Sequence, residues 1–96
     1  MAEAEVEVRN PSGLHARPAA FFVRASAAFT SEVLVANLTR DATRTASAKS
    51  VLGVMGLAVS RGDRIRIAAE GTDADEAVAR LSELVRSGLG EAIDGA

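Results

Sequence analysis

The sequence contains no cysteine, no tryptophan and no tyrosine, and it has a single histidine among 96 residues. Without cysteine, neither a disulfide framework nor a thiolate-ligated metal centre can form. A metal site usually needs several strong ligands, and only scattered carboxylates accompany the one histidine. We therefore expect no metal and no cofactor. At this length one domain, residues 1–96, can bury an ordinary core without such staples.

The sequence also lacks an excess of basic residues and a long hydrophobic run. Its 11 Lys and Arg face 13 Asp and Glu, for a net charge of −2, so nothing favours binding to nucleic acid or to a membrane surface. The longest apolar run, Val51–Val59 with its glycines, is far shorter than the ~20 residues that span a bilayer. The acidic N-terminal segment has no basic start of a signal peptide. We expect a soluble, cytoplasmic protein.

Hydrophobic periodicity predicts seven secondary-structure elements. Val6 and Val8 alternate with charged residues, as in a half-buried strand,. The last segment begins with what resembles a capping box at Thr72–Asp75 and stops at Gly88 and Gly90,. The predicted elements are, in chain order, a strand at Ala4–Arg9, a helix at Ala16–Phe29, strands at Glu32–Asn37 and Thr43–Ala46, a short helix at Val51–Leu57, a strand around Ile65 and Ile67, and a helix with an apolar stripe of Ala77, Val78, Leu81, Leu84 and Val85.

This order of elements, joined by short links, favours one architecture. We expect an α+β fold, an open-faced sandwich in which three helices cover one face of a four-stranded, mainly antiparallel sheet.

His15 is the first candidate for chemistry, because it stands where a turn containing Gly13 meets the start of a helix. A helix N-terminus presents unpaired N–H groups and a partial positive charge, so an anion can rest there. The same field disfavours a protonated imidazole and leaves a ring nitrogen free as a nucleophile. His15 could thus accept a phosphoryl group, with Arg17 and nearby amides neutralising its oxygens. The position alone leaves open that His15 is an ordinary solvated residue.

Ser50 and the apolar segment after it form the second candidate region. Ser50 is predicted to be the N-cap of the short helix, and a phosphate on it would change the charge of the local surface,. The helix is apolar all round, with Val51, Leu52, Val54, Met55 and Leu57, so some of these residues should be exposed. An exposed Met and Leu patch usually marks a surface for partners. Burial in the core explains many of these residues equally well.

Two segments together resemble the signature regions of the HPr family, the phosphocarriers of the bacterial phosphoenolpyruvate-dependent sugar phosphotransferase system. The first is Gly13–Ala20, and the second is Ala48–Leu57. The resemblance implies that His15 takes a phosphoryl group on Nδ1 from phosphorylated enzyme I and passes it to the A domain of a sugar permease. It also implies that Arg17 stabilises the phosphohistidine, and that Ser50 matches the serine that an HPr kinase modifies in many Gram-positive-type members.

The same resemblance extends to partners. We expect a monomer that docks enzyme I and permease A domains through Ala16, Ala20, Val51, Leu52 and Met55. Two alternatives stay open. One is a regulatory module gated by phosphorylation of Ser50, with a kinase and a transcriptional regulator as further partners. The other is a carrier in a dihydroxyacetone-kinase chain, since the segment Asn37–Ser47 is similar in length to that of HPr-like domains in such proteins.

Overall fold

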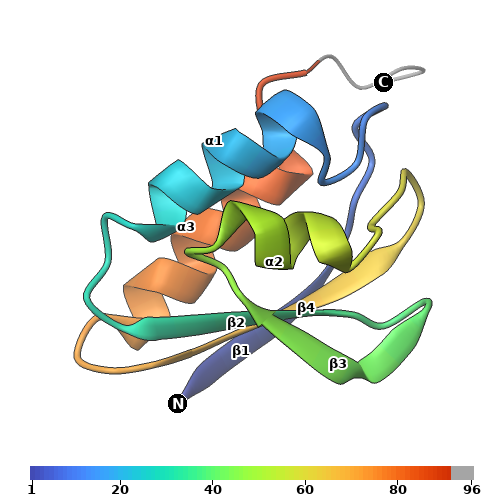
Figure 1. Ribbon diagram of the computed structural model, residues 1–96. Coiled ribbons are helices and arrows are strands. Elements are labelled where there is room, and N and C mark those ends of the chain that lie inside the picture. Colours follow the sequence, from blue (N-terminus) through green and yellow to red (C-terminus); the bar gives the residue numbers. More distant parts are fainter. Residues whose placement is uncertain (92–96) are drawn as a thin grey trace.

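The computed structural model describes residues 1–91, which form four strands and three helices (Figure 1). None of the helices in this range is long and apolar enough to cross a membrane. The elements are, in chain order, β1 (Ala2–Glu7), α1 (Ala16–Ser26), β2 (Glu32–Asn37), β3 (Asp41–Ser47), α2 (Val51–Gly56), β4 (Arg64–Glu70) and α3 (Ala74–Arg86).

The strands form one antiparallel sheet in the order β1-β4-β2-β3. Its register sets Val6 of β1 opposite Ile65 of β4, and Val35 of β2 opposite Ile67 of β4. All four side chains are buried, because successive residues of a strand point to opposite faces and these point toward the helices,. Figure 1 shows the three helices on this one side of the sheet. The expected open-faced α+β sandwich is confirmed.

The core lies between the sheet and the helices. Phe22 of α1, Val54 of α2 and Leu81 of α3 are completely buried against the inward face of the sheet. The apolar stripe predicted for the last helix is the side of α3 that packs there, and Leu84 is its one partly exposed member. Burying a side chain of this size contributes roughly 1.5–3 kcal/mol, so these contacts hold the helices in place.

Three elements have clearly other bounds than the sequence suggests. Strand β3, expected at Thr43–Ala46, is longer at both ends and spans Asp41–Ser47. Helix α1 stops at Ser26, where the backbone bonds tighten, as in Phe29 N–H to Ser26 O at 3.2 Å, and Phe29 turns back to pack against the core. No glycine or proline marks this end, and Phe29 keeps the seven-residue spacing from Phe22, so the helical pattern continues past it. Strand β1 lies two residues earlier than expected, because Val8 bonds instead to Gly62 and Asp63 of a turn.

The start of α3 differs from the capping box expected at Thr72–Asp75. Asp73 is the N-cap residue, but its side chain makes no cap hydrogen bond. Its carboxylate accepts instead from the backbone N–H groups of Thr30 and Ser31, each at 2.9 Å, and from the Ser31 hydroxyl. These bonds, that of the Ser31 hydroxyl first, lower the pKa of Asp73 to about 2. The capping-box prediction is wrong because donors from a distant loop reach this carboxylate.

Helix α3 ends just before Gly88, as expected from the sequence. The Gly88 N–H donates to Val85 O at 3.1 Å, and the Leu89 N–H donates to Leu84 O at 3.0 Å. This is the Schellman pattern, in which Gly88 adopts a positive φ, here +97°,. The turn that follows lies beside the start of α1 (Figure 1).

Candidate functional site

The loop between β1 and α1 is held against the segment that follows α2. Gly13 has a φ of +59°, and a Cβ on it would lie 2.3 Å from the carbonyl oxygen of Val59, so a larger residue would push the two segments apart,. The Leu14 N–H donates to the same oxygen at 3.1 Å, and the Leu14 side chain is completely buried. The backbone that leads into His15 is therefore firmly anchored.

His15 is the N-cap residue of α1, with an extended backbone at φ −127° and ψ 156°. Its side chain is half-buried and makes no hydrogen bond or ion pair within residues 1–91. The first N–H groups of a helix have no partner inside it and carry the positive end of its dipole. A free imidazole thus stands at the anion-favouring end of α1, as the sequence predicts.

Ala16, between the two residues singled out in the sequence, has an unusual backbone conformation. Its φ is +51°, in the left-handed region that side chains with a Cβ rarely adopt, at a cost of about 1–2 kcal/mol,. The sequence gives no sign of this conformation, because alanine rarely adopts a positive φ. Backbone strain of this kind is often found at functional sites.

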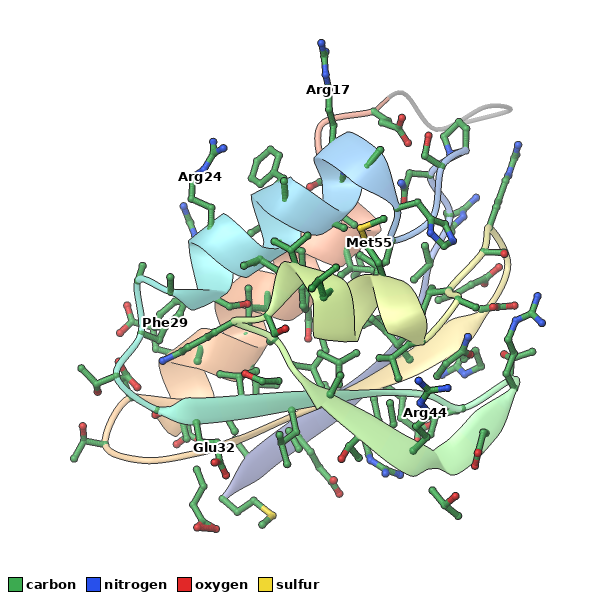
Figure 2. The ribbon with its side chains drawn as sticks, viewed as in Figure 1. Arg17, Arg24, Phe29, Glu32, Arg44 and Met55 are labelled. Atoms are coloured by element: carbon green, nitrogen blue, oxygen red, sulfur yellow. The ribbon has the colours of Figure 1, made fainter. Side chains whose placement is uncertain are left out.

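Arg17 follows in the first turn of α1 and is exposed. Its guanidinium makes no hydrogen bond or ion pair with the described part of the chain. Figure 2 shows Arg17 and Arg24 extending from α1 away from the sheet. With Ala20 and Phe21 they line a shallow hollow on the outer face of this helix. Arg17 is therefore free to reach an anion at the end of α1.

Helix α2 packs beside α1 and combines burial with exposure. The Ser50 hydroxyl oxygen accepts from the Gly53 N–H at 3.0 Å, which confirms Ser50 as its N-cap. Val54 is buried, whereas Leu52 is 85% exposed and Met55 is 36% exposed. The expectation that this apolar helix exposes one side is confirmed, and its use as a partner surface stays a prediction.

The predicted site residues do not all lie together. Lys49 Nζ donates to Phe29 O at 2.7 Å, so the start of α2 and Ser50 lie near the far end of α1 from His15. Met55 lies between α1 and α2 (Figure 2). An apolar surface thus separates Ser50 from His15.

One group near His15 was not foreseen from the sequence. The carboxylate of Glu91, beyond α3, accepts hydrogen bonds from Asn10 and Ser12 in the loop before His15. The amide of Asn10 first, then the N–H and hydroxyl of Ser12, hold the pKa of Glu91 below its ordinary value. About eighty residues separate the partners, so no local pattern could have revealed the contact.

Comparison with known proteins identifies the family of this arrangement. The family model described as "PTS HPr component phosphorylation site" matches residues 2–87. The chain is 43% identical over 86 residues to the HPr-like protein Crh of Bacillus subtilis. The alignment covers 90% of this chain and 96% of Crh. It is 44% identical over 84 residues to the multiphosphoryl transfer protein of Haemophilus influenzae, covering 88% of this chain but 17% of that protein. The chain thus spans less than a quarter of the length of such multiphosphoryl relatives.

A solved structure agrees in fold as well as in sequence. The crystal structure of HPr-C-His from Thermoanaerobacter tengcongensis matches with a TM-score of 0.88 at 40% identity, over 97% of this chain and 100% of that chain. The range matched by the family model includes His15, Arg17 and Ser50 and ends before Glu91. The chain therefore belongs to the HPr family, the phosphocarrier proteins of the phosphotransferase system.

Proposed function

We propose that His15 accepts a phosphoryl group from phosphorylated enzyme I and passes it to the A domain of a sugar permease. The observation that carries the proposal is the unpaired imidazole of His15 at the N-cap of α1. A ring nitrogen attacks the phosphorus atom, and the bond from phosphorus to its donor breaks as the new N–P bond forms. In the second transfer His15 is the leaving group, so one side chain suffices for both steps.

Phosphoryl transfer depends mainly on positioning and on stabilising charge. Gly13 and Leu14 anchor the backbone before His15, and the N–H groups of the first turn of α1 face an anion there,. The free guanidinium of Arg17 adds planar, charge-assisted donors for the phosphoryl oxygens. These groups fit the role of a carrier, which needs no further covalent machinery.

The exposed apolar residues of α1 and α2 are proposed to dock both partners in turn. Ala16, Ala20, Val51, Leu52 and Met55 are all at least partly exposed and lie on the two neighbouring helices α1 and α2. Arg17 and Arg24 extend from α1 (Figure 2), and Lys49 precedes α2 with its Nζ on Phe29 O. These positive charges fit an acidic rim on a partner. We propose that the carrier works as a monomer, because the same surface must be open to each partner. We also propose that it works in the cytoplasm.

A two-step labelling experiment tests the relay. Incubation with phosphoenolpyruvate and enzyme I should add one acid-labile phosphoryl group, measured by mass spectrometry. Subsequent addition of a permease A domain should remove that group within minutes. A chain that gains no phosphoryl group would contradict the proposal. If the chain gains a phosphoryl group and loses it only to a dihydroxyacetone-kinase component, that component would take the place of the permease A domain as the acceptor from His15.

A regulatory role at Ser50 is the second candidate. Its hydroxyl oxygen accepts the Gly53 N–H, so the hydroxyl proton takes no part in the cap. A phosphate on this oxygen would still face the start of α2, where negative charge is favoured, while placing that charge at the edge of the apolar surface. Phosphorylation could thus block docking without unfolding the helix.

A further inference from the structure

The turn after α3 is fitted to the outer helix of the site. Gly90 has a φ of +86°, and a Cβ on it would lie 3.2 Å from the ring of Phe21 in α1. The Glu91 N–H donates to Gly88 O at 2.9 Å, which closes the turn. Glu91 is thereby held beside α1 and is directed to the loop before His15.

The carboxylate of Glu91 receives three hydrogen bonds from that loop. Its Oε1 accepts from Asn10 Nδ2 at 2.9 Å and from the Ser12 N–H at 3.0 Å. Its Oε2 accepts from the Ser12 hydroxyl at 2.8 Å. Hydrogen bonds to an ionised acceptor are roughly twice as strong as those between neutral groups, so this contact is a strong constraint on the loop.

Besides Glu91, the only hydrogen-bond partner of Asn10 and Ser12 within residues 1–91 is Gly13. Asn10 is completely buried, and its Oδ1 accepts no hydrogen bond within the described residues. Its amide nitrogen donates to Gly13 O at 2.9 Å and to Glu91. Without Glu91, one amide proton of Asn10 and both donors of Ser12 would lose their partner. Only contacts through Gly13 and Leu14 would then hold this part of the loop, namely the packing and backbone bonds of these two residues and the Asn10 amide bond to Gly13 O.

We propose that Glu91 is a positioning residue for His15, acting through Asn10 and Ser12 to fix the loop that presents the imidazole. The proposal rests on the proposed function of His15 as phosphoryl acceptor. A displacement of about 1 Å in a reacting group can lower a rate on the order of a hundredfold, so a strong constraint three residues from the nucleophile affects transfer. The role belongs to the side chain and does not require Glu91 to touch the phosphoryl group.

Two variants separate position from charge. Glu91→Ala removes all three acceptor contacts. Glu91→Gln keeps an Oε1 that can accept from Asn10 and from the Ser12 N–H, but it loses the charge, and its amide nitrogen can only donate to the Ser12 hydroxyl oxygen,. Glu83→Ala is the matched control, because Glu83 is an exposed carboxylate of α3 whose side chain makes no hydrogen bond or ion pair within residues 1–91. Cooperative thermal unfolding of each variant shows that it is folded.

Three quantities are compared across these variants. NMR gives the signals of the His15 ring and the hydrogen-exchange rate of the Ser12 amide. Rapid-quench experiments give the rate of phosphoryl acceptance from phosphorylated enzyme I. Glu91→Ala should shift the ring signals, speed Ser12 exchange and slow acceptance about tenfold. Glu91→Gln should keep the ring signals close to those of wild type and both the Ser12 exchange rate and the acceptance rate within about threefold of wild type, since the Oε1 contacts are kept,. Glu83→Ala should match wild type.

Three outcomes would contradict the positioning role of Glu91 or the acceptor role of His15. Unchanged ring signals and rate in Glu91→Ala would overturn the positioning role. A Glu91→Gln variant as slow as Glu91→Ala would overturn it in favour of a purely electrostatic effect. If wild type accepts no phosphoryl group, the proposed function fails, and the ring signals still decide whether Glu91 positions His15.

Discussion

His15 ends a loop and precedes the first residue of a helix, and this double position suits the proposed role of one side chain as both phosphoryl acceptor and donor. The loop is anchored by Gly13 and Leu14, while α1 supplies the field that favours an anion,. The strained backbone of Ala16 lies between His15 and Arg17. The neighbours of His15 thus provide position and charge without any other reactive group.

Arg17 is expected to act on the transferred charge and not on the fold. Arg17→Ala should slow acceptance at least about tenfold, because it removes donors from the developing phosphoryl charge. The free energy of unfolding should change by less than about 0.5 kcal/mol, since the guanidinium has no partner within residues 1–91,. Rapid-quench rates with saturating enzyme I check this. Arg80→Ala, at an exposed position of α3, should keep the wild-type rate, and equal loss in both variants would remove the special role of Arg17.

Ser50 is expected to stabilise α2 first and to regulate second. Ser50→Ala should lower the free energy of unfolding by about 1 kcal/mol in urea titrations, because the Gly53 N–H loses its acceptor,. Ser50→Asp can still cap and should keep the stability. It should accept phosphate on His15 more slowly if Ser50 lies in the enzyme I contact, because its charge must be desolvated. A wild-type rate for Ser50→Asp at both low and moderate salt would leave Ser50 as a cap only.

Residue-level prediction from sequence succeeds where a local pattern carries the signal. The turn before His15 and the cap at Ser50 are both readable because one neighbouring segment decides them. The left-handed φ of Ala16 and the contacts of Glu91 depend on packing between distant parts of the chain. Neither feature can be predicted from the residue type at its position.

Helix α2 is the element on which the proposed docking depends, and its six residues include two glycines. Such a short helix is unstable alone, so the cap at Ser50 and the burial of Val54 must hold it,. Those anchors point one side inward and leave Leu52 and Met55 outward. An apolar surface exposed in this way is expected to be covered by a partner.

Leu52→Asp tests this surface. The variant should unfold like wild type, because the side chain is 85% exposed. Its complex with enzyme I should weaken by more than about 2 kcal/mol, since a charge would be buried in an apolar contact. Calorimetric titration measures the affinity. Val54→Asp is the contrast, and it should unfold the domain. Wild-type affinity for Leu52→Asp would place the docking surface elsewhere.

The contact between Asp73 and the loop before β2 gives an expected pH dependence. Bonds from Ser31 and Thr30 lower the pKa of Asp73 from 3.8 to about 2, so the folded state binds its proton less readily than the unfolded state. The stabilisation is therefore complete above about pH 4 and is lost as the pH falls toward 2.

Asp73→Asn should flatten the fall of unfolding free energy between these pH values, measured by urea titration at several pH values. Asp75→Asn, in the first turn of the same helix, should keep the wild-type slope. Parallel pH curves for Asp73→Asn and wild type would show that this carboxylate contributes nothing to acid stability.

At the scale of the whole molecule, the fold places all the residues proposed to act in transfer and docking on the helical side of the sheet. All three helices lie on one side of the sheet, with α1 and α2 outward and α3 beside the loop that Glu91 binds (Figure 1). The class of fold could be predicted because alternating strands and amphipathic helices admit few packings. The strand order β1-β4-β2-β3 could not, because β1 and β4 pair across more than fifty residues and local patterns do not encode such pairing.

The most direct test of the account is the site of phosphorylation itself. Wild type and His15→Ala are each incubated with phosphoenolpyruvate and enzyme I, and acid-labile phosphoryl groups are counted by intact-mass spectrometry. The account predicts one group on wild type and none on His15→Ala, with the same unfolding transition for both, because the half-buried ring has no bonded partner within residues 1–91. An acid-labile group retained by His15→Ala, or absent from wild type, would contradict it.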